Sequence, residues 1–163
     1  MSKILVSACL LGCKVRYNAS DVKVDNKIFE QLIEENEIIP FCPEVSAGLL
    51  TPRPSVEIQG GEGIDVLRGT ASVIEVNGID VSHSFCRGAK MALDKCIEHK
   101  ISLAILNESS PSCGSSFIYD GTFTGKKKAG MGVTAALLKE NGIKVKSQHE
   151  VCHLLKFPRL TKK

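Results

Sequence analysis

The sequence contains no tryptophan, and phenylalanine and tyrosine together make up only 5% of its 163 residues. So low an aromatic content offers no visible stacking platform for single-stranded nucleic acid. The formal net charge is only +3, which is too small to indicate a nucleic-acid-binding protein. We therefore expect no DNA partner and no direct RNA binding, and we interpret the basic stretch at residues 156–163 as a solvated tail.

Long apolar runs are also absent. No window approaches eighteen consecutive apolar residues, so the sequence predicts no membrane partner. The apolar run near the N-terminus, ILVSACLL at residues 4–11, lacks the h-region and cleavage site of a signal peptide and is interpreted as a buried strand. We expect a cytoplasmic protein with a single domain over residues 1–163.

Cysteine, in contrast, is abundant, with seven residues in the chain. An odd number of cysteines in a reducing compartment argues against a disulfide framework. Clustered thiols in such a protein more often bind metal or take part in catalysis. The sequence has no C-x-x-C pair, so the spacing alone does not mark a structural zinc site.

The hydrophobic pattern alternates between strands and helices. Apolar strands are predicted at 3–11, 37–42, 101–108 and 143–147, and amphipathic helices at 25–36, 82–100, 132–142 and 148–157. The paired glycines Gly60–Gly61 and the turn at Asn77–Gly78 predict β-hairpins within 54–82, and the turn at Asp120–Gly121 predicts another within 116–130. This order predicts an α/β fold, a three-layer sandwich around a mostly parallel, Rossmann-like sheet with added β-hairpins.

Three cysteines follow three of the predicted strands: Cys9, Cys42 and Cys113. Ligands of open α/β sheets bind beyond the carboxyl ends of the strands, so these thiols can converge in one crevice. Cys86, Cys96 and Cys152 fall on predicted helices and are interpreted as small buried hydrophobes. Cys13 is either a spare ligand or a resolving thiol.

Polar residues with possible roles surround these cysteines. Glu44 is either a base beside a metal or a helix cap or rim salt bridge. Arg53 is either a clamp for a substrate anion or carbonyl or a partner of Glu57. The serines next to Cys113 either bind a ligand or cap turns, and they are Ser110, Ser112, Ser115 and Ser116. Arg16 and Tyr17 are further candidates for the lining of the pocket.

Three thiolates leave a tetrahedral metal ion one ligand short. An iron–sulfur cluster held by three cysteines would keep one iron free for a substrate. The alternative is that the three loop cysteines merely pack. Spacing does not choose between zinc and iron.

Five stretches, in this order, resemble a bacterial family long catalogued as a domain of unknown function, the thiouracil desulfidases. They are SACLLG…RYN, FCPEVSAGLLTPRPSVEI, GIDVSHSFCRGA, LNESSPSCGSSFIYDGTFTG and GMGVTAALLKENGI. The resemblance implies a 4Fe-4S cluster bound by Cys9, Cys42 and Cys113. It also implies non-redox desulfuration of 2-thiouracil or 4-thiouracil, in which a water activated by Glu44 attacks the thio-carbon.

The resemblance further implies that Ser110 and Ser112 handle protons or bind substrate, and Arg53 and Ser115 are the predicted substrate-binding residues. The chain departs from the family pattern at Asn18–Ala19, where Asp-Gly is usual, at residues 47–50 and at Asn107. Because these departures fall in pocket-lining loops, they bear on the identity of the substrate and not on the cluster ligands.

Two functions of other classes are kept as alternatives. One is a zinc- or thiol-based binding module without turnover, and the other is a sulfur-handling partner in tRNA thiolation. The sequence HEVCH at 149–153 fits the H-E-x-x-H metalloprotease pattern, but no His, Asp or Glu follows it. Ser147 and Glu150 are better explained as a capping box.

Overall fold

The computed structural model describes residues 2–14, 16–19, 23–24 and 27–151. Its central sheet contains β1 (Lys3–Ser7), β2 (Glu37–Phe41), β5 (Leu103–Leu106) and β8 (Lys144–Ser147). All neighbouring strands are parallel, in the order β2-β1-β5-β8. The four predicted parallel strands are thus confirmed, with β1 in a central position. Pro40, which has no N–H to donate, lies in the edge strand β2, where proline is tolerated.

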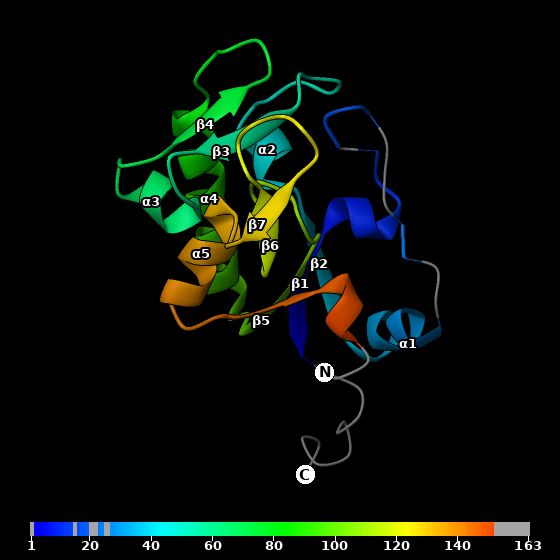
Figure 1. Cartoon of the computed structure of the whole chain (residues 1–163). Coiled ribbons are helices and arrows are strands. Elements are labelled where there is room, and N and C mark those ends of the chain that lie inside the picture. Colours follow the sequence, from blue (N-terminus) through cyan, green and yellow to red (C-terminus); the bar gives the residue numbers. More distant parts are fainter. Residues whose placement is uncertain (1, 15, 20–22, 25–26, 152–163) are drawn as a thin grey trace.

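Helices cover both faces of this sheet (Figure 1), in three layers as predicted. On one face, Leu5, Ala104 and Leu106 pack against α4 (Ser82–His99) and α5 (Val133–Glu140). On the other face, Ile4, Val6 and Ile105 pack against α1 (Lys27–Glu35). Successive residues of a strand face opposite sides of a sheet, so the short apolar runs of β1 and β5 supply both cores.

Short antiparallel pairs flank the sheet. The pair β6 (Phe117–Tyr119) and β7 (Lys127–Ala129) forms the hairpin predicted within 116–130. The strands β3 (Val56–Gln59) and β4 (Ser72–Glu75) also pair, but α3 (Gly63–Leu67) lies between them. The expected hairpin turn at Gly60–Gly61 is therefore wrong. The carboxylate of Asp65 accepts a hydrogen bond from the N–H of Glu62 at 2.9 Å and caps the new helix.

The last described element is the 3₁₀ turn η2 (Gln148–Glu150). The hydroxyl of Ser147 accepts from the N–H of His149 at 3.2 Å, and the Glu150 carboxylate accepts from the N–H of Ser147 at 2.9 Å. The predicted capping box is confirmed. Most of the predicted helix at 148–157, with Cys152 and His153, lies outside the described residues. Within the described part of the chain, we find no helix with the length and apolarity to cross a bilayer.

A short helix, α2 (Pro43–Ser46), packs against the middle of α4. The contact is close because residue 88 of α4 has no side chain, and a Cβ there would overlap the carbonyl oxygen of Pro43. Arg87 reinforces the contact, since its guanidinium donates to the carbonyl of Ala47. The position of α2 therefore depends on Gly88.

We predict that Gly88→Ala lowers the melting temperature. Helix propensity alone would stabilise this variant by about 1 kcal/mol, so a lower melting temperature would identify the clash with α2 as the larger effect. Thermal denaturation followed by circular dichroism measures this, with Lys90→Ala on the exposed side of α4 as the control. A melting temperature at or above that of the wild type would show that α2 does not depend on this contact.

Candidate functional site

A cavity of about 500 Å³ lies beyond the carboxyl ends of β1, β2 and β5. This is the edge at which ligands of open α/β sheets bind. Cys9, Cys42 and Cys113 all line it, together with Glu44 and Arg53. The three cysteines that the sequence placed in one crevice thus line one cavity. Other lining residues include Ser7, Arg16, Tyr17, Glu57, Asn107, Glu108, Ser110, Tyr119, Phe123, Lys127 and His149.

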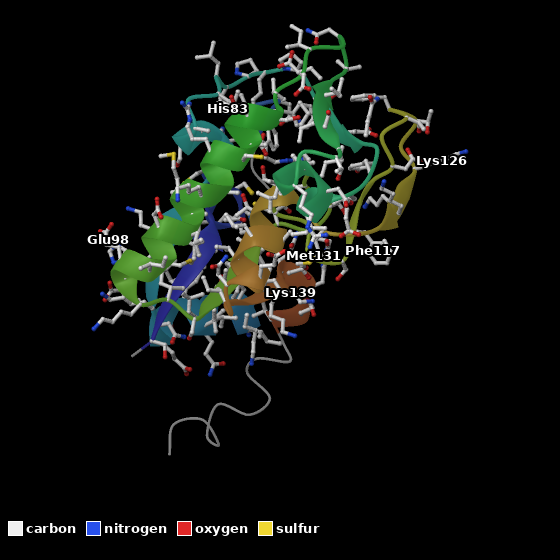
Figure 2. The ribbon with its side chains drawn as sticks, turned by 90° about the vertical axis from the view of Figure 1, so that its left-hand side faces the viewer. His83, Glu98, Phe117, Lys126, Met131 and Lys139 are labelled. Carbon is white, nitrogen blue, oxygen red and sulfur yellow. The ribbon has the colours of Figure 1, made fainter. Side chains whose placement is uncertain are left out.

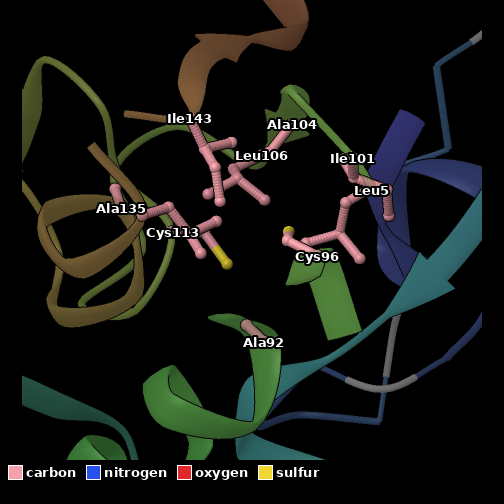
Figure 3. Packing of buried hydrophobic residues seen from close by; sticks show 10 residues of the cluster. Leu5, Ala92, Cys96, Ile101, Ala104, Leu106, Cys113, Ala135 and Ile143 are labelled. Carbon is pink, nitrogen blue, oxygen red and sulfur yellow. The ribbon is translucent and has the colours of Figure 1, made fainter. Parts of the chain in front are cut away.

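The N-terminus of α5 fixes the loop that carries Cys113. The N–H groups of Thr134 and Ala135 donate to the carbonyl of Ser112 at 2.8 and 3.1 Å, and that of Val133 donates to Pro111 at 2.8 Å. Helix N-termini have unsatisfied N–H groups, and the loop carbonyls satisfy them here. Gly132 permits this approach, because a Cβ there would lie 2.6 Å from the Ser112 carbonyl oxygen. Figure 3 shows Cys113 beside Ala135 at the edge of the core.

Glu108 holds the same loop from the opposite side. Its Oε1 accepts hydrogen bonds of 3.0 to 3.2 Å from four backbone N–H groups, those of Ser109, Ser115, Ser116 and Phe117. Burial alone would raise the pKa of Glu108, but these N–H groups outweigh it and leave the pKa lowered. The carboxylate is thus a structural anion at the centre of the loop.

The loop that carries Cys9 follows β1 directly, in the 3₁₀ turn η1 (Ala8–Leu11). Gly12 ends this turn in the left-handed region, at φ 95°. The preceding residue, Ser7, was not predicted as a site residue. Its hydroxyl accepts from the N–H of Asn107 at 3.0 Å and lowers the pKa of Cys113 through a hydrogen bond. Its position at the end of a central strand, two residues before Cys9, is the signal that could have identified it.

The three thiols influence one another. Burial raises the pKa of Cys9 to about 11, and the neighbouring Cys42 acts in the same direction. Burial is also the main reason why the pKa of Cys42 is raised. The pKa of Cys113 is well above its ordinary value, first because of burial and then because Cys9, Cys42 and Glu44 are near. Such a set of acids can ionise together only when a cation compensates their charge.

Glu44 is held in place by two side chains. Its Oε1 accepts from Nη2 and Nε of Arg53 at 2.8 and 3.0 Å, and its Oε2 accepts from the Ser112 hydroxyl at 3.1 Å. The side chains of Glu44 and Arg53 are only 13% and 8% exposed. Arg53 thus pairs with Glu44 and not with Glu57, the partner considered from the sequence. Its Nη1 further donates to the Leu50 carbonyl and the Thr51 hydroxyl.

The remaining predicted residues divide into two groups. Ser110 lines the cavity, and its oxygen accepts from the N–H groups of Ser112 and Cys113 at 3.1 and 3.2 Å. Ser115 is not among the lining residues, and its hydroxyl donates to Glu108 at 3.3 Å. Cys96 is buried in the core between the sheet and the helices, as expected. Cys13 is exposed and does not line the cavity.

The donor set fits a cluster better than a single ion. Among the described residues, no three His, Cys, Asp or Glu side chains gather closely enough to hold one metal ion. A tetrahedral zinc draws its thiolates to about 2.3 Å from one point. In an iron–sulfur cluster each thiolate binds a different iron, so the sulfurs can stand further apart. Cys9, Cys42 and Cys113 line one cavity without meeting at one point, an arrangement that a cluster accommodates.

Comparison with known proteins extends over nearly the whole chain. Residues 4–150 match the sequence model of the 2-thiouracil desulfurase family. The chain is 47% identical over 152 residues to the uncharacterized protein YbbK of Bacillus subtilis (strain 168), a match that covers 93% of this chain and 99% of YbbK.

A solved structure, that of the 4Fe-4S-dependent thiouracil desulfidase TudS, superposes with a TM-score of 0.87. It is 42% identical in sequence, and the match covers 98% of this chain and 99% of TudS. The similarity therefore includes the complete sheet and the loops around the cavity, and it confirms the fold class predicted from the sequence.

We predict that Glu108→Gln destabilises the protein most at neutral pH. A carboxylate with a lowered pKa in the folded state stabilises that state above its unfolded pKa, and the contribution disappears as the pH falls through the folded pKa. The difference in melting temperature between wild type and variant should therefore shrink as the pH is lowered below about 4.5, the ordinary value for glutamate. Thermal denaturation across this range tests it.

The control is Glu30→Gln, which changes an exposed carboxylate on α1. Two results would contradict the structural role of Glu108. One is a loss of melting temperature in Glu108→Gln that is as small as in this control, and the other is a loss that grows as the pH is lowered.

Proposed function

This chain belongs to the 2-thiouracil desulfurase family, and we propose that it replaces the sulfur of a thiolated pyrimidine by oxygen. The substrate would be of the 2-thiouracil or 4-thiouracil type. The observation that carries the proposal is the shared cavity, in which Cys9, Cys42 and Cys113 lie with a carboxylate held by Arg53. The reaction consumes one water, converts C=S to C=O and releases hydrogen sulfide, so no electrons are exchanged.

The three cysteines are the proposed cluster ligands, and the buried thiols fit this role as argued above. When bound, a 4Fe-4S cluster with three thiolate ligands supplies an iron without a protein ligand, which prefers a thiocarbonyl sulfur to a carbonyl oxygen and polarises it as a Lewis acid. Binding requires thiolates, and the charge of the iron would add to the smaller compensation that Arg16 and Arg53 give the thiols.

Glu44 is the proposed general base, and Oε2 is the atom that accepts the proton. Each carboxylate oxygen has about two lone pairs. Oε1 accepts two hydrogen bonds from Arg53, whereas Oε2 accepts only one from the described residues, that of Ser112. The second lone pair of Oε2 can therefore receive a proton from the water that attacks the thio-carbon. Arg53 and Ser112 act as positioning residues for this carboxylate.

Ser110 is the serine proposed to contact the substrate. Its oxygen already accepts two backbone N–H groups, so its hydroxyl hydrogen is the part that can be directed at a ligand in the cavity. A hydroxyl that donates to the ring nitrogen or to the departing sulfur would assist proton transfer.

The predicted substrate contacts of Arg53 and Ser115 remain predictions. A single domain in the cytoplasm, with a small thiolated nucleobase as its partner, completes the proposal.

We predict that serine substitution of Cys9, Cys42 or Cys113 prevents cluster binding. Anaerobic reconstitution should give about four irons per chain in the wild type and less than about one in each variant, with loss of the absorbance at about 400 nm. Cys13→Ser is the matched control and should keep its iron. About one zinc per chain and no iron in the reconstituted wild type would instead favour a binding module without turnover.

We predict that Glu44→Gln lowers the rate of sulfide release from 2-thiouracil by about 10²- to 10⁴-fold, the usual contribution of a general base. The iron content should not change, because Glu44 is not a proposed ligand. Glu98→Gln, at the far end of α4 (Figure 2), is the control for a carboxylate outside the cavity. A variant at position 44 that keeps the full rate with a full cluster would remove Glu44 from the mechanism.

A further inference from the structure

The cavity collects aromatic side chains from a chain that has few of them. The sequence contains six phenylalanines and two tyrosines. Both tyrosines line the cavity, and so do Phe41 and Phe123. Phe123 differs from the others, because it lies on the connection between β6 and β7 and not on the central part of the fold.

The backbone of Phe123 is in the left-handed region, at φ 57°. A bulky side chain rarely adopts this conformation, whereas glycine adopts it readily. The same connection uses glycine at its two other left-handed positions, Gly121 (φ 93°) and Gly125 (φ 80°). A glycine at 123 would suit the turn, so the aromatic ring is kept there at a conformational cost. Strained residues of this kind cluster at functional sites.

A buried carboxylate holds the connection in place. Oε1 of Glu57, on β3, accepts from the N–H groups of Gly121 at 2.9 Å and Phe123 at 3.1 Å. Glu57 is only 9% exposed. Gln59 adds a hydrogen bond of 2.9 Å from Nε2 to the Gly121 carbonyl. The backbone at 121 lies so close to β3 that a Cβ would stand 2.7 Å from the Ile58 carbonyl oxygen. The position of Phe123 at the cavity wall is therefore fixed by β3.

We propose that the ring of Phe123 is the surface on which the planar heterocycle of the substrate stacks, and that Glu57 is the residue that positions it. This inference rests on the proposed function, because it assigns the specificity of the same cavity for flat, aromatic thiocarbonyl compounds. An aromatic face in a partly closed cavity attracts a flat unsaturated ring more strongly than a puckered one, because only the flat ring makes full contact.

Binding of the reaction product separates this inference from the desulfuration itself. Uracil is flat, and 5,6-dihydrouracil is a puckered compound with the same pattern of donors and acceptors. We expect calorimetry with the wild type to show tighter binding of uracil. Phe123→Leu should weaken uracil binding by about tenfold, within the range measured for a base on an aromatic side chain, and should change dihydrouracil binding by less than about twofold.

Phe117→Leu is the matched control, since Phe117 belongs to the same hairpin but is 50% exposed and projects outward (Figure 2). Phe123→Gly is the second variant. It removes the ring together with the left-handed strain, so weaker uracil binding at an unchanged melting temperature would exclude misfolding as the cause. Glu57→Gln should show the same loss of preference for uracil, to a smaller extent.

Steady-state kinetics of the reconstituted enzyme give the second readout. For 2-thiouracil, Phe123→Leu should raise KM by about tenfold and leave kcat and the iron content close to wild type. Unchanged uracil binding in Phe123→Leu, or equal losses for uracil and dihydrouracil, would overturn the stacking role and leave the proposed function intact. A wild type with a full cluster that binds uracil but releases no sulfide from 2-thiouracil would overturn the proposed function and leave the stacking surface in place.

Discussion

The thiols of Cys9, Cys42 and Cys113 line one cavity with Glu44, and burial and these acidic neighbours raise the pKa of the thiols. In a site of low polarity, like charges raise each other's pKa and none ionises readily. A positively charged group is therefore needed before the thiols become thiolates. This constraint links the cofactor to the three cysteines, because a bound cluster supplies the positive charge that thiolates need.

Three glutamates line the cavity, and the fold uses them in two different ways. Glu57 and Glu108 accept backbone N–H groups and so hold the loops that carry Phe123 and Cys113. Glu44 instead accepts from the side chains of Arg53 and Ser112. The backbone N–H groups around Glu108 lower its pKa and so make it a weak base. Within the described part of the chain, Oε2 of Glu44 accepts a single hydrogen bond, from Ser112, which leaves room for a proton in the proposed base step.

The sequence was sufficient to predict where the cavity lies, but not which hydrogen bonds its lining side chains form. Cys9, Cys42 and Cys113 could be placed together because each follows a strand of a parallel sheet, and such strands end at one edge. The pairing of Arg53 with Glu44 could not be chosen over Glu57, since both carboxylates lie within nine residues of Arg53 in a segment without periodicity. The roles of Ser7 and Glu57 depend on contacts with residues 64 or more positions away. The helix α3 was missed because five residues are too few to establish a helical period.

The spacing of the thiols is set by three separate parts of the fold. Cys9 is held by the turn that ends at Gly12, Cys42 by α2 in contact with Gly88, and Cys113 by the N-terminus of α5. No two of these contacts share an element, so each sulfur is positioned by its own part of the fold. Packed contacts of this kind resist displacement. A cluster, which offers a different iron to each thiolate, suits three sulfurs that are positioned independently.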